Sequence, residues 1–256
     1  MSLITAPGNV PLLKALLDYE KSTYGYDIPL IEAPLIDTVI DKQAWAREVM
    51  GEYDHVISIE ILGAARSVLL PFTGLLSEVQ LTQVIQSFYL CSDGGYYNMR
   101  GVEASALNAP IDAIFTLARK DGSQVRTISI GDGGNEIGMG NLYELVSKHV
   151  PGGSKIGCRV TTDHLITAGV SNWGGYALAC ALYLIQSHPT LSCTPNADMR
   201  MIPDVGVESA QLDVMLANDA VDGPTCAAER KIDSLDFEYH EKMLKMMIAL
   251  CRINEH

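Results

Sequence analysis

Five glycines fall within ten residues at 131–140 (GDGGNEIGMG), directly after the β-branched run TISI at 127–130. A helical pattern, NLYELVSKHV, follows at 141–150, and Asn141 with Glu144 forms a candidate capping box for it. A glycine-dense loop between a strand and a helix is typical of α/β folds, which bind ligands beyond the carboxyl ends of their strands. Glycine permits positive φ and lets backbone N–H groups approach an oxyanion closely. We therefore expect this loop to bind a ligand.

The rest of the chain alternates helical and strand-like segments. Residues 55–62 are rich in β-branched side chains and predict a strand. Helices are predicted from apolar spacing at 11–24, 41–50, 77–91, 175–186 and 237–251. The alternation predicts an α/β fold with a mixed or mainly parallel sheet flanked by helices.

Two segments have more than one possible structural role. Residues 192–208 contain two prolines and little periodicity, so we expect a long surface loop, either a lid or an irregular connection. The Met-rich helix at 237–251 fits either the core or a contact in a homo-oligomer.

Composition narrows the classes of function. The chain has 256 residues, with 18 Lys and Arg against 31 Asp and Glu, for a net charge of −13. Such an acidic surface repels a phosphate backbone, so a nucleic acid partner is not expected. The apolar runs are shorter than the roughly 18 residues that span a bilayer, so no membrane association is expected.

The length suits a single domain over 1–256, because no repeat or long polar linker divides the chain. Its six cysteines form no Cys-x-x-Cys pair and mostly lie in apolar stretches, which predicts reduced thiols. The first ten residues, MSLITAPGNV, lack the patterns of a secretory signal and a transit peptide. We therefore expect a cytoplasmic location.

The acids in the glycine loop change its expected chemistry. Asp132 and Glu136 would face a pyrophosphate unscreened, and no Lys-Ser/Thr follows the glycines, so no nucleotide cofactor is expected. Two carboxylates four residues apart could hold a divalent cation or transfer protons. Alternatively, they cap backbone N–H groups of a tight loop, and spacing alone does not separate these two interpretations.

Two further clusters are candidates for substrate binding. In SDGGYYNMRG at 92–101, the fork of Arg100 suits a carboxylate, although a lone Arg beside a turn is commonly a surface residue. In AGVSNWGGY at 168–176, Ser171 or Asn172 could cap the helix that follows, and Trp173 could line a pocket. The alternative there is a cap and a core tryptophan.

Three blocks of this sequence, SDGGYYNMRGVE, ISIGDGGNEIGMGN and TAGVSNWGGYALACALY, resemble in order and spacing the C-terminal domain of D-glutamate cyclases. The resemblance covers residues 93–186 and continues more weakly to IDSLDFEYHEKML, where His240 matches a family histidine. It implies a lyase that removes water from D-glutamate to give 5-oxo-D-proline, or runs the reverse reaction. Related animal proteins carry an additional N-terminal hydro-lyase-like domain and reside in the mitochondrial matrix.

The segment after the first predicted strand departs from this family. The family follows Ser-Ile-Glu with basic residues, whereas here Ser58 to Glu60 is followed by ILGAARS, so Glu60 alone carries over. Residues 67–91 form an atypical insertion, which we expect to be a peripheral helix.

The resemblance also implies roles for individual residues. Arg100 would clamp the α-carboxylate, and amides after Ser171 and around Gly133 would receive the γ-carboxylate. Asp132 or Glu136 would act as base or, with Glu60, hold a divalent ion such as Mg, Mn or Ca, and His240 would carry protons. The expected substrate-binding residues are Asn98, Gly133, Gly134, Asn135, Ser171, Asn172 and Trp173. We expect residues 131–140 and 171–175 to share one cavity.

Two alternatives remain from the same residues. A metal-dependent hydrolase of a small phosphorylated compound would use the same acidic loop. A non-catalytic module that binds a metal or small molecule would show stabilisation by its ligand without turnover.

Overall fold

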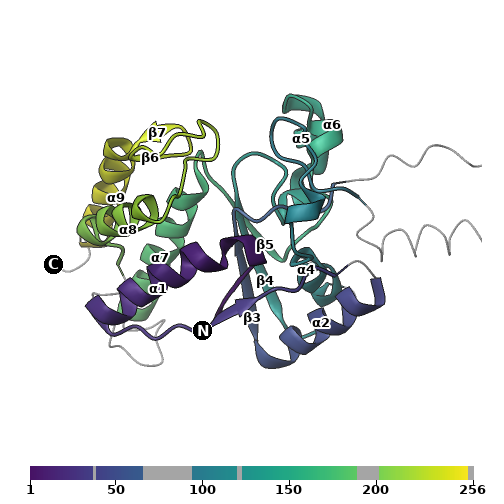
Figure 1. Cartoon of the computed structure of the whole chain (residues 1–256), viewed down its shortest axis with the longest axis horizontal. Helices are drawn as coiled ribbons and strands as arrows, with labels where there is room; N and C mark the ends of the chain where they lie inside the picture. The colour runs from purple at the N-terminus through teal and green to yellow at the C-terminus, as the bar shows by residue number, and fades with distance from the viewer. Residues whose placement is uncertain (37–38, 66–93, 120–122, 189–201, 253–256) are drawn as a thin grey trace, which may run out of the picture. The chain divides into compact units, whose positions relative to one another are not determined.

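The structure is a computed structural model that describes residues 1–36, 39–65, 94–119, 123–188 and 202–252 (Figure 1). The predicted helix at 77–91 and the predicted insertion at 67–91 lie outside the described residues. The chain divides into two compact units. The sheet unit contains residues 4–8 and 31–168, and the helical unit contains residues 1–3, 9–30 and 169–256. The prediction of a single domain stays a prediction.

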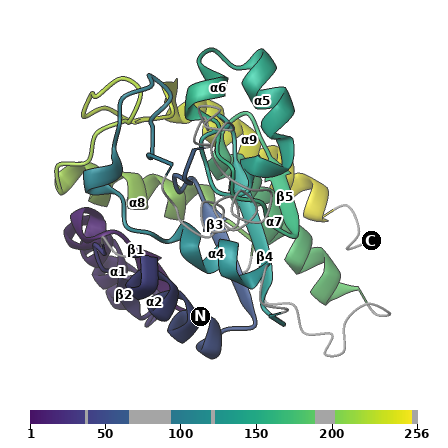
Figure 2. The same cartoon turned by 90° about the vertical axis from the view of Figure 1, so that its right-hand side faces the viewer.

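A parallel three-stranded sheet is the centre of the sheet unit. Its strands are β3 (His55–Ile59), β4 (Arg126–Gly131) and β5 (His164–Thr167), in the order β3-β4-β5, and Figures 1 and 2 show them side by side. The register pairs Ile57 with Ile128 and Ile128 with His164. The α/β class and the strands predicted at 55–62 and 127–130 are confirmed. Because all three strands are parallel, their carboxyl ends meet at one edge.

Two helices pack with this sheet to form the core of the unit. They are α2 (Val39–Glu52) and α4 (Asp112–Ala118), which contact each other. Ile114 and Phe115 of α4 are almost fully buried, and Val56 of β3 and Leu165 of β5 pack against the same cluster. Burial of these apolar side chains, at about 1.5–3 kcal/mol each, holds the sheet against the helices.

The glycine loop joins β4 to a run of short helices. These are η3 (Met139–Leu142), α5 (Tyr143–His149) and α6 (Gly153–Ile156). The predicted capping box at the start of this run is wrong, because Asn141 is used elsewhere. Its Nδ2 donates to the Thr162 carbonyl at 3.0 Å, and its Oδ1 accepts from the Thr162 N–H at 3.0 Å. Asn141 thus links the loop to the segment that enters β5.

The helical unit consists mainly of four helices. They are α1 (Val10–Tyr24), α7 (Ser171–Ser187), α8 (Val205–Ala217) and α9 (Phe237–Arg252). Helix α1 packs on α8, and α9 packs on both α7 and α8. A short hairpin of β6 (Lys231–Ile232) and β7 (Leu235–Asp236) precedes α9. The helices predicted at 11–24, 41–50, 175–186 and 237–251 are confirmed. Elsewhere in the described residues, and not confined to the helical unit, lie β1 (Leu3–Thr5), η1 (Pro7–Asn9), β2 (Leu30–Glu32) and η2 (Ser105–Leu107).

The loop predicted at 192–208 is wrong over its last residues, because helix α8 begins within that range. The helix begins at Val205, so the last four residues of that range are helical, and residues 192–201 lie outside the described residues. Asp204 caps the helix by accepting the N–H groups of Gly206 at 2.8 Å and Val207 at 3.1 Å. Two prolines and weak periodicity suggested a loop, whereas Pro203 and Asp204 here precede a capped helix start.

The start of α7 also differs from the expectation. The N-cap is Val170, which makes no side-chain cap, and Ser171 is the first helical residue and 1% exposed. Gly174 and Gly175 lie inside the helix and do not form a loop. Residues 168–170 connect the end of β5 to α7, and residues 171–175 form the first part of the helix itself.

Within the part of the chain that the structure describes, no helix has both the length and the apolar character that a membrane crossing needs.

Candidate functional site

Three carboxylates lie together at the carboxyl edge of the parallel sheet. Glu60 follows β3 directly, Asp132 follows β4 directly, and Glu136 lies four residues further along the glycine loop. One ligand oxygen from each of them lies within 4.8 Å of the others. Because β3 and β4 are neighbouring parallel strands, their ends bring Glu60 and Asp132 to the same edge. The structure thus brings together the three residues predicted to hold a metal ion. We call them the acidic cluster.

The backbone of Glu60 is strained. Its φ is 55°, in the left-handed region that non-glycine residues rarely adopt, while its N–H still donates to the Ile130 carbonyl at 3.2 Å. Such a conformation costs about 1–3 kcal/mol and persists where the surroundings require it. A strained acidic residue at a strand end is therefore a second sign that this edge has a function.

Glu136 is the buried member of the acidic cluster, at 1% exposure. Its carboxylate accepts the N–H groups of Gly133 at 2.9 Å and Gly134 at 2.8 Å, and Gly134 has a φ of +114° that favours glycine. Burial raises the pKa of Glu136, the two N–H groups oppose this increase, and the charge of Asp132 adds to it. The carboxyl group is therefore held where a proton or a cation would stabilise it.

This arrangement bears on two expectations about the glycine loop. Of the two roles considered for Glu136, the capping of loop N–H groups is present, and the carboxyl group is buried; its role as a metal ligand or proton carrier stays a prediction. The amides of Gly133 and Gly134 bind Glu136 in this structure. Their part in substrate binding stays a prediction, and it would require Glu136 to release them.

The donor set of the acidic cluster fits a hard divalent cation. Carboxylate oxygens are the ligands that Mg²⁺, Mn²⁺ and Ca²⁺ prefer, and neither a thiol nor an imidazole belongs to the group. Carboxylates this close repel one another when all are ionised. A bound cation would relieve that repulsion. A shared proton would do the same, so proton transfer and metal binding are both open to this cluster.

A turn at 97–103 lies against the glycine loop. Asn135, which is 4% exposed, donates through Nδ2 to the Tyr97 carbonyl at 2.8 Å. A Cβ added at Gly133 would lie 2.6 Å from Met99 Sδ, so Met99 packs directly on the loop backbone. Arg100 follows Met99 in this turn and is exposed. The predicted residues Arg100 and Asn135 thus belong to the same unit as the acidic cluster.

Asn98 shapes this turn. Its Oδ1 accepts the N–H groups of both Arg100 and Val102 at 3.0 Å. Asparagine side chains commonly close turns in this way. The oxygen of Asn98 is therefore used within the turn, and its predicted part in substrate binding stays a prediction.

Asp112 was missed by the sequence analysis. It lies in the first turn of α4, is 1% exposed, and accepts from Tyr96 Oη at 2.7 Å and the Ala64 N–H at 3.3 Å. Burial raises the pKa of Asp112, and these two hydrogen bonds oppose the increase. The carboxyl group ties the segments around Ala64 and Tyr96 to α4. A single acid within the apolar run NAPIDAIF was the available signal.

The other predicted residues lie in the helical unit. Trp173 donates through Nε1 to His240 Nδ1 at 3.0 Å, and the rings are 5.8 Å apart. His240 is 1% exposed, and its Nε2 lies 3.0 Å from the Ile232 carbonyl. The tautomer that satisfies both contacts is neutral, with the proton on Nε2. Burial lowers the pKa of His240, which agrees with a neutral ring. Both nitrogens are engaged inside the unit, so this geometry favours a structural role.

The expected shared cavity stays a prediction. Residues 131–140 belong to the sheet unit, and Ser171, Asn172 and Trp173 belong to the helical unit. The binding roles of these three residues likewise stay predictions.

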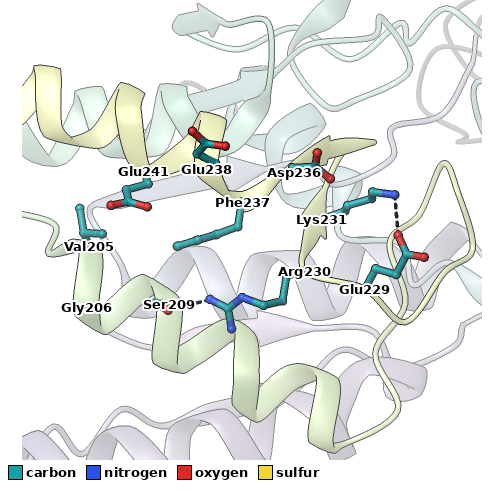
Figure 3. Close-up of a pocket in the computed structure, with 10 residues that line it drawn as sticks. All are labelled: Val205, Gly206, Ser209, Glu229, Arg230, Lys231, Asp236, Phe237, Glu238 and Glu241. Carbon is teal, nitrogen blue, oxygen red and sulfur yellow. Dashed lines mark hydrogen bonds and ion pairs between the residues drawn. The ribbon is translucent and has the colours of Figure 1, made fainter.

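A pocket of about 640 Å³ lies within the helical unit, between the first turns of α8 and α9 and the β6–β7 hairpin (Figure 3). Arg230 lies over Phe237 and binds Asp213 and Ser209, and Lys231 pairs with Glu229. On the opposite wall, Glu238 pairs with Lys242 and Glu241 with Lys245. Most of the charge here is balanced by neighbouring side chains. None of the residues predicted for the site is among those that line this pocket.

The fold and the acidic cluster together define an α/β protein with a cluster of acidic side chains where the strands of its parallel sheet end. Residues 84–248 match the family described as D-glutamate cyclase-like, C-terminal, and the chain belongs to this family. Human "D-glutamate cyclase, mitochondrial" is 35% identical over 170 residues, which cover 61% of this chain and 27% of the human protein. The chain thus matches about a quarter of the length of that relative.

Proposed function

We propose that this chain is a lyase of the D-glutamate cyclase type, which closes D-glutamate to 5-oxo-D-proline with loss of water, or catalyses the reverse. The observation that carries the proposal is the acidic cluster, Glu60, Asp132 and Glu136, at the sheet edge of a chain of this family. The name of the human relative supports the choice of substrate.

The reaction balances without an oxidant or a second substrate. The α-nitrogen forms a bond to the γ-carboxyl carbon, and a bond from that carbon to one γ-oxygen breaks. The ammonium gives up two protons, both of which leave on that oxygen as water. The α-carboxylate is unchanged, so the net charge of the organic molecule stays at one negative. The catalyst must therefore take a proton from nitrogen and deliver protons to oxygen.

The acidic cluster offers groups for both transfers. Asp132 is the less buried of the two loop acids and would accept the ammonium proton. Glu136 has a pKa raised mainly by burial, so it could hold a proton and donate it to the leaving oxygen. Glu60, whose strained backbone follows the end of β3, would supply a third carboxylate oxygen for a metal ion. In the alternative state, with all three carboxylates ionised, a divalent ion held by them would supply Lewis-acid polarisation of the γ-carboxyl group in place of the proton on Glu136.

Binding the substrate requires positive charge inside an acidic protein. The chain carries a net charge of −13 and the substrate has two carboxylates. Local cations must therefore offset the negative electrostatic potential of the protein. Arg100, in the turn that packs on the glycine loop, would bind the α-carboxylate through its fork. One guanidinium cannot serve both carboxylates. The divalent ion would neutralise the second.

The test is an NMR time course on purified protein with D-glutamate, L-glutamate and both 5-oxoproline enantiomers, with and without a chelator. We expect conversion of the D form only, loss of conversion with the chelator, and recovery with Mn²⁺ or Mg²⁺. Asp132→Asn and Glu60→Gln should lower turnover by at least about 100-fold in folded protein. Glu48→Gln, at an exposed position of α2, is the matched control and should behave as the wild type.

The outcomes separate a lyase from a non-catalytic binding module. Stabilisation by D-glutamate or a cation without turnover would show a binding module and contradict the lyase proposal. Full activity of both cluster variants would show that the chemistry lies elsewhere.

A further inference from the structure

Lys155 connects the end of α6 to the turn that carries Arg100. Its Nζ donates to the Gly101 carbonyl at 2.8 Å and lies 5.0 Å from the centre of the Tyr97 ring. Gly101 follows Arg100 directly, and Tyr97 begins the turn. A single side chain thus binds both arms of the turn. Because its donor is charged, the hydrogen bond is stronger than one between neutral groups, and the ring adds a cation–π attraction.

The turn itself is a closed unit. Tyr97 and Glu103 form a bridge, the Asn98 N–H donates to the Val102 carbonyl at 3.0 Å, and the Gly101 N–H donates to the Asn98 carbonyl at 2.9 Å. Gly101 has a φ of +71°, which glycine adopts without strain. These bonds fix the shape of the turn. They do not fix its position against the rest of the unit.

The position of the turn is set from two sides. On one side, Asn135 of the glycine loop donates to the Tyr97 carbonyl at 2.8 Å. On the other, Lys155 holds the Gly101 carbonyl. The base of Lys155 is itself firmly placed, because a Cβ at Gly153 would lie 2.0 Å from the Val146 carbonyl oxygen of α5. Helix α6 is therefore packed backbone to backbone on α5. Lys155, which is exposed, therefore reaches the turn from a helix that packs closely on α5.

We propose that Lys155 is a positioning residue that holds the Arg100 turn against the glycine loop, so that the guanidinium is set for a substrate carboxylate beside the acidic cluster. The inference rests on the proposed function for the part played by Arg100. In this proposal Lys155 acts through the Arg100 turn and not on the reacting atoms. Its effect should therefore fall on substrate binding and leave the chemical step intact.

The test compares Lys155→Met, Lys155→Arg and wild type, with Lys148→Met as the control. Lys148 is an exposed lysine in the last turn of α5. Hydrogen exchange of the amides at 98–104 should be about tenfold faster in Lys155→Met and unchanged in Lys148→Met. In D-glutamate turnover, Lys155→Met should raise KM about tenfold with kcat within about twofold of wild type. Lys155→Arg, which keeps the charge and the donors, should restore most of both.

Each result decides a separate step. Unchanged exchange at 98–104 in folded Lys155→Met would overturn the holding role. Faster exchange with an unchanged KM would overturn the link to substrate. A fall in kcat with KM unchanged would also contradict it. If wild type neither converts nor binds D-glutamate, the proposed function and the substrate link fail together, and the exchange measurement still decides whether Lys155 holds the turn.

Discussion

The acidic cluster of the sheet unit and the pocket of the helical unit are both rich in charge, but they arrange it in opposite ways. In the acidic cluster, three carboxylates point oxygens to within 4.8 Å of one another. In the pocket, bases lie next to acids: Lys231 pairs with Glu229 (Figure 3), and Arg230 pairs with Asp213 of α8, which lies outside the lining residues. A set of mixed charges can balance itself. A set of like charges gains from a cation or a proton, which is why we assign the chemistry to the sheet unit.

One buried titratable group from each unit, Glu136 and His240, extends the comparison. Glu136 and His240 are each 1% exposed. Burial raises the pKa of the acid and lowers that of the imidazole, so both favour their neutral forms. The partners differ, however. Glu136 accepts two loop N–H groups but also lies beside a second carboxylate, whereas the two ring nitrogens of His240 contact neutral groups, Trp173 and a backbone carbonyl. Burial alone therefore does not mark a catalytic group.

The largest expected difference between the two regions is in the effect of matched substitutions on turnover. Asp132→Asn removes one charge of the acidic cluster and should lower turnover by about 10²–10⁴-fold, as expected for a lost acid–base group. Asp213→Asn removes one charge of the balanced pair with Arg230 and should leave turnover unchanged. Steady-state rates on folded proteins measure both. Equal effects would erase the distinction between the two regions.

The next largest effect concerns the stability of the glycine loop. Glu136→Gln replaces a carboxylate oxygen with an NH₂ group opposite a backbone N–H, so one of the Gly133 and Gly134 amides loses its acceptor. We expect a loss of about 1–3 kcal/mol in the free energy of unfolding, measured in urea. The exposed counterpart Glu238→Gln in α9 should show no measurable loss. A Glu136 variant as stable as wild type would contradict the capping geometry.

A smaller effect should appear in the pH dependence of the helical unit. The folded-state pKa of His240 lies below its ordinary value of 6.5, so the unfolded chain binds more protons below that pH. Stability should be full above about pH 6.5 and fall as the pH decreases toward the folded-state pKa. His240→Asn should flatten this slope between pH 5 and pH 7.5 in urea unfolding, with kcat retained. An unchanged slope would show that another group is responsible.

The smallest effect is expected for Arg230→Met. The side chains of Arg230 and Asp213 are 42% and 61% exposed, and exposed ion pairs contribute under about 1 kcal/mol. The methionine also retains some of the packing against Phe237. Unfolding in urea and D-glutamate turnover should both stay close to wild type. A large loss of turnover would move the proposed site toward the pocket.

Regular periodicity made much of the fold predictable. The helices at 11–24, 41–50, 175–186 and 237–251 and the strands at 55–62 and 127–130 were predicted because apolar or β-branched residues repeat there at a fixed spacing. Helix α8 was missed because VGVESAQLDVMLA has apolar residues on all sides and follows a proline. Its cap, Asp204, becomes recognisable only once the helix is known.

The candidate site was predictable as a set of residues but not in its bonding. A glycine loop after a strand pointed to Asp132 and Glu136, and the family resemblance added Glu60. That Glu136 occupies the Gly133 and Gly134 amides depends on loop backbone angles, which spacing does not encode. Likewise, Asn141 proved to bind Thr162, which lies 21 positions away in the chain. A local capping rule cannot anticipate such a partner.

The left-handed backbone at Glu60 should make the residue that directed evolution selects at position 60 depend on whether stability or catalysis is selected. Glycine at this position would adopt the φ of 55° without penalty, and asparagine would tolerate it better than most residues. A library of all residues at position 60, selected only for resistance to heat, should therefore enrich glycine and asparagine. The same library selected for growth that depends on catalysis should retain acids. Position 60 is where the two selections should diverge most, and the divergence would measure how much folding stability this chain forgoes to keep a carboxylate there.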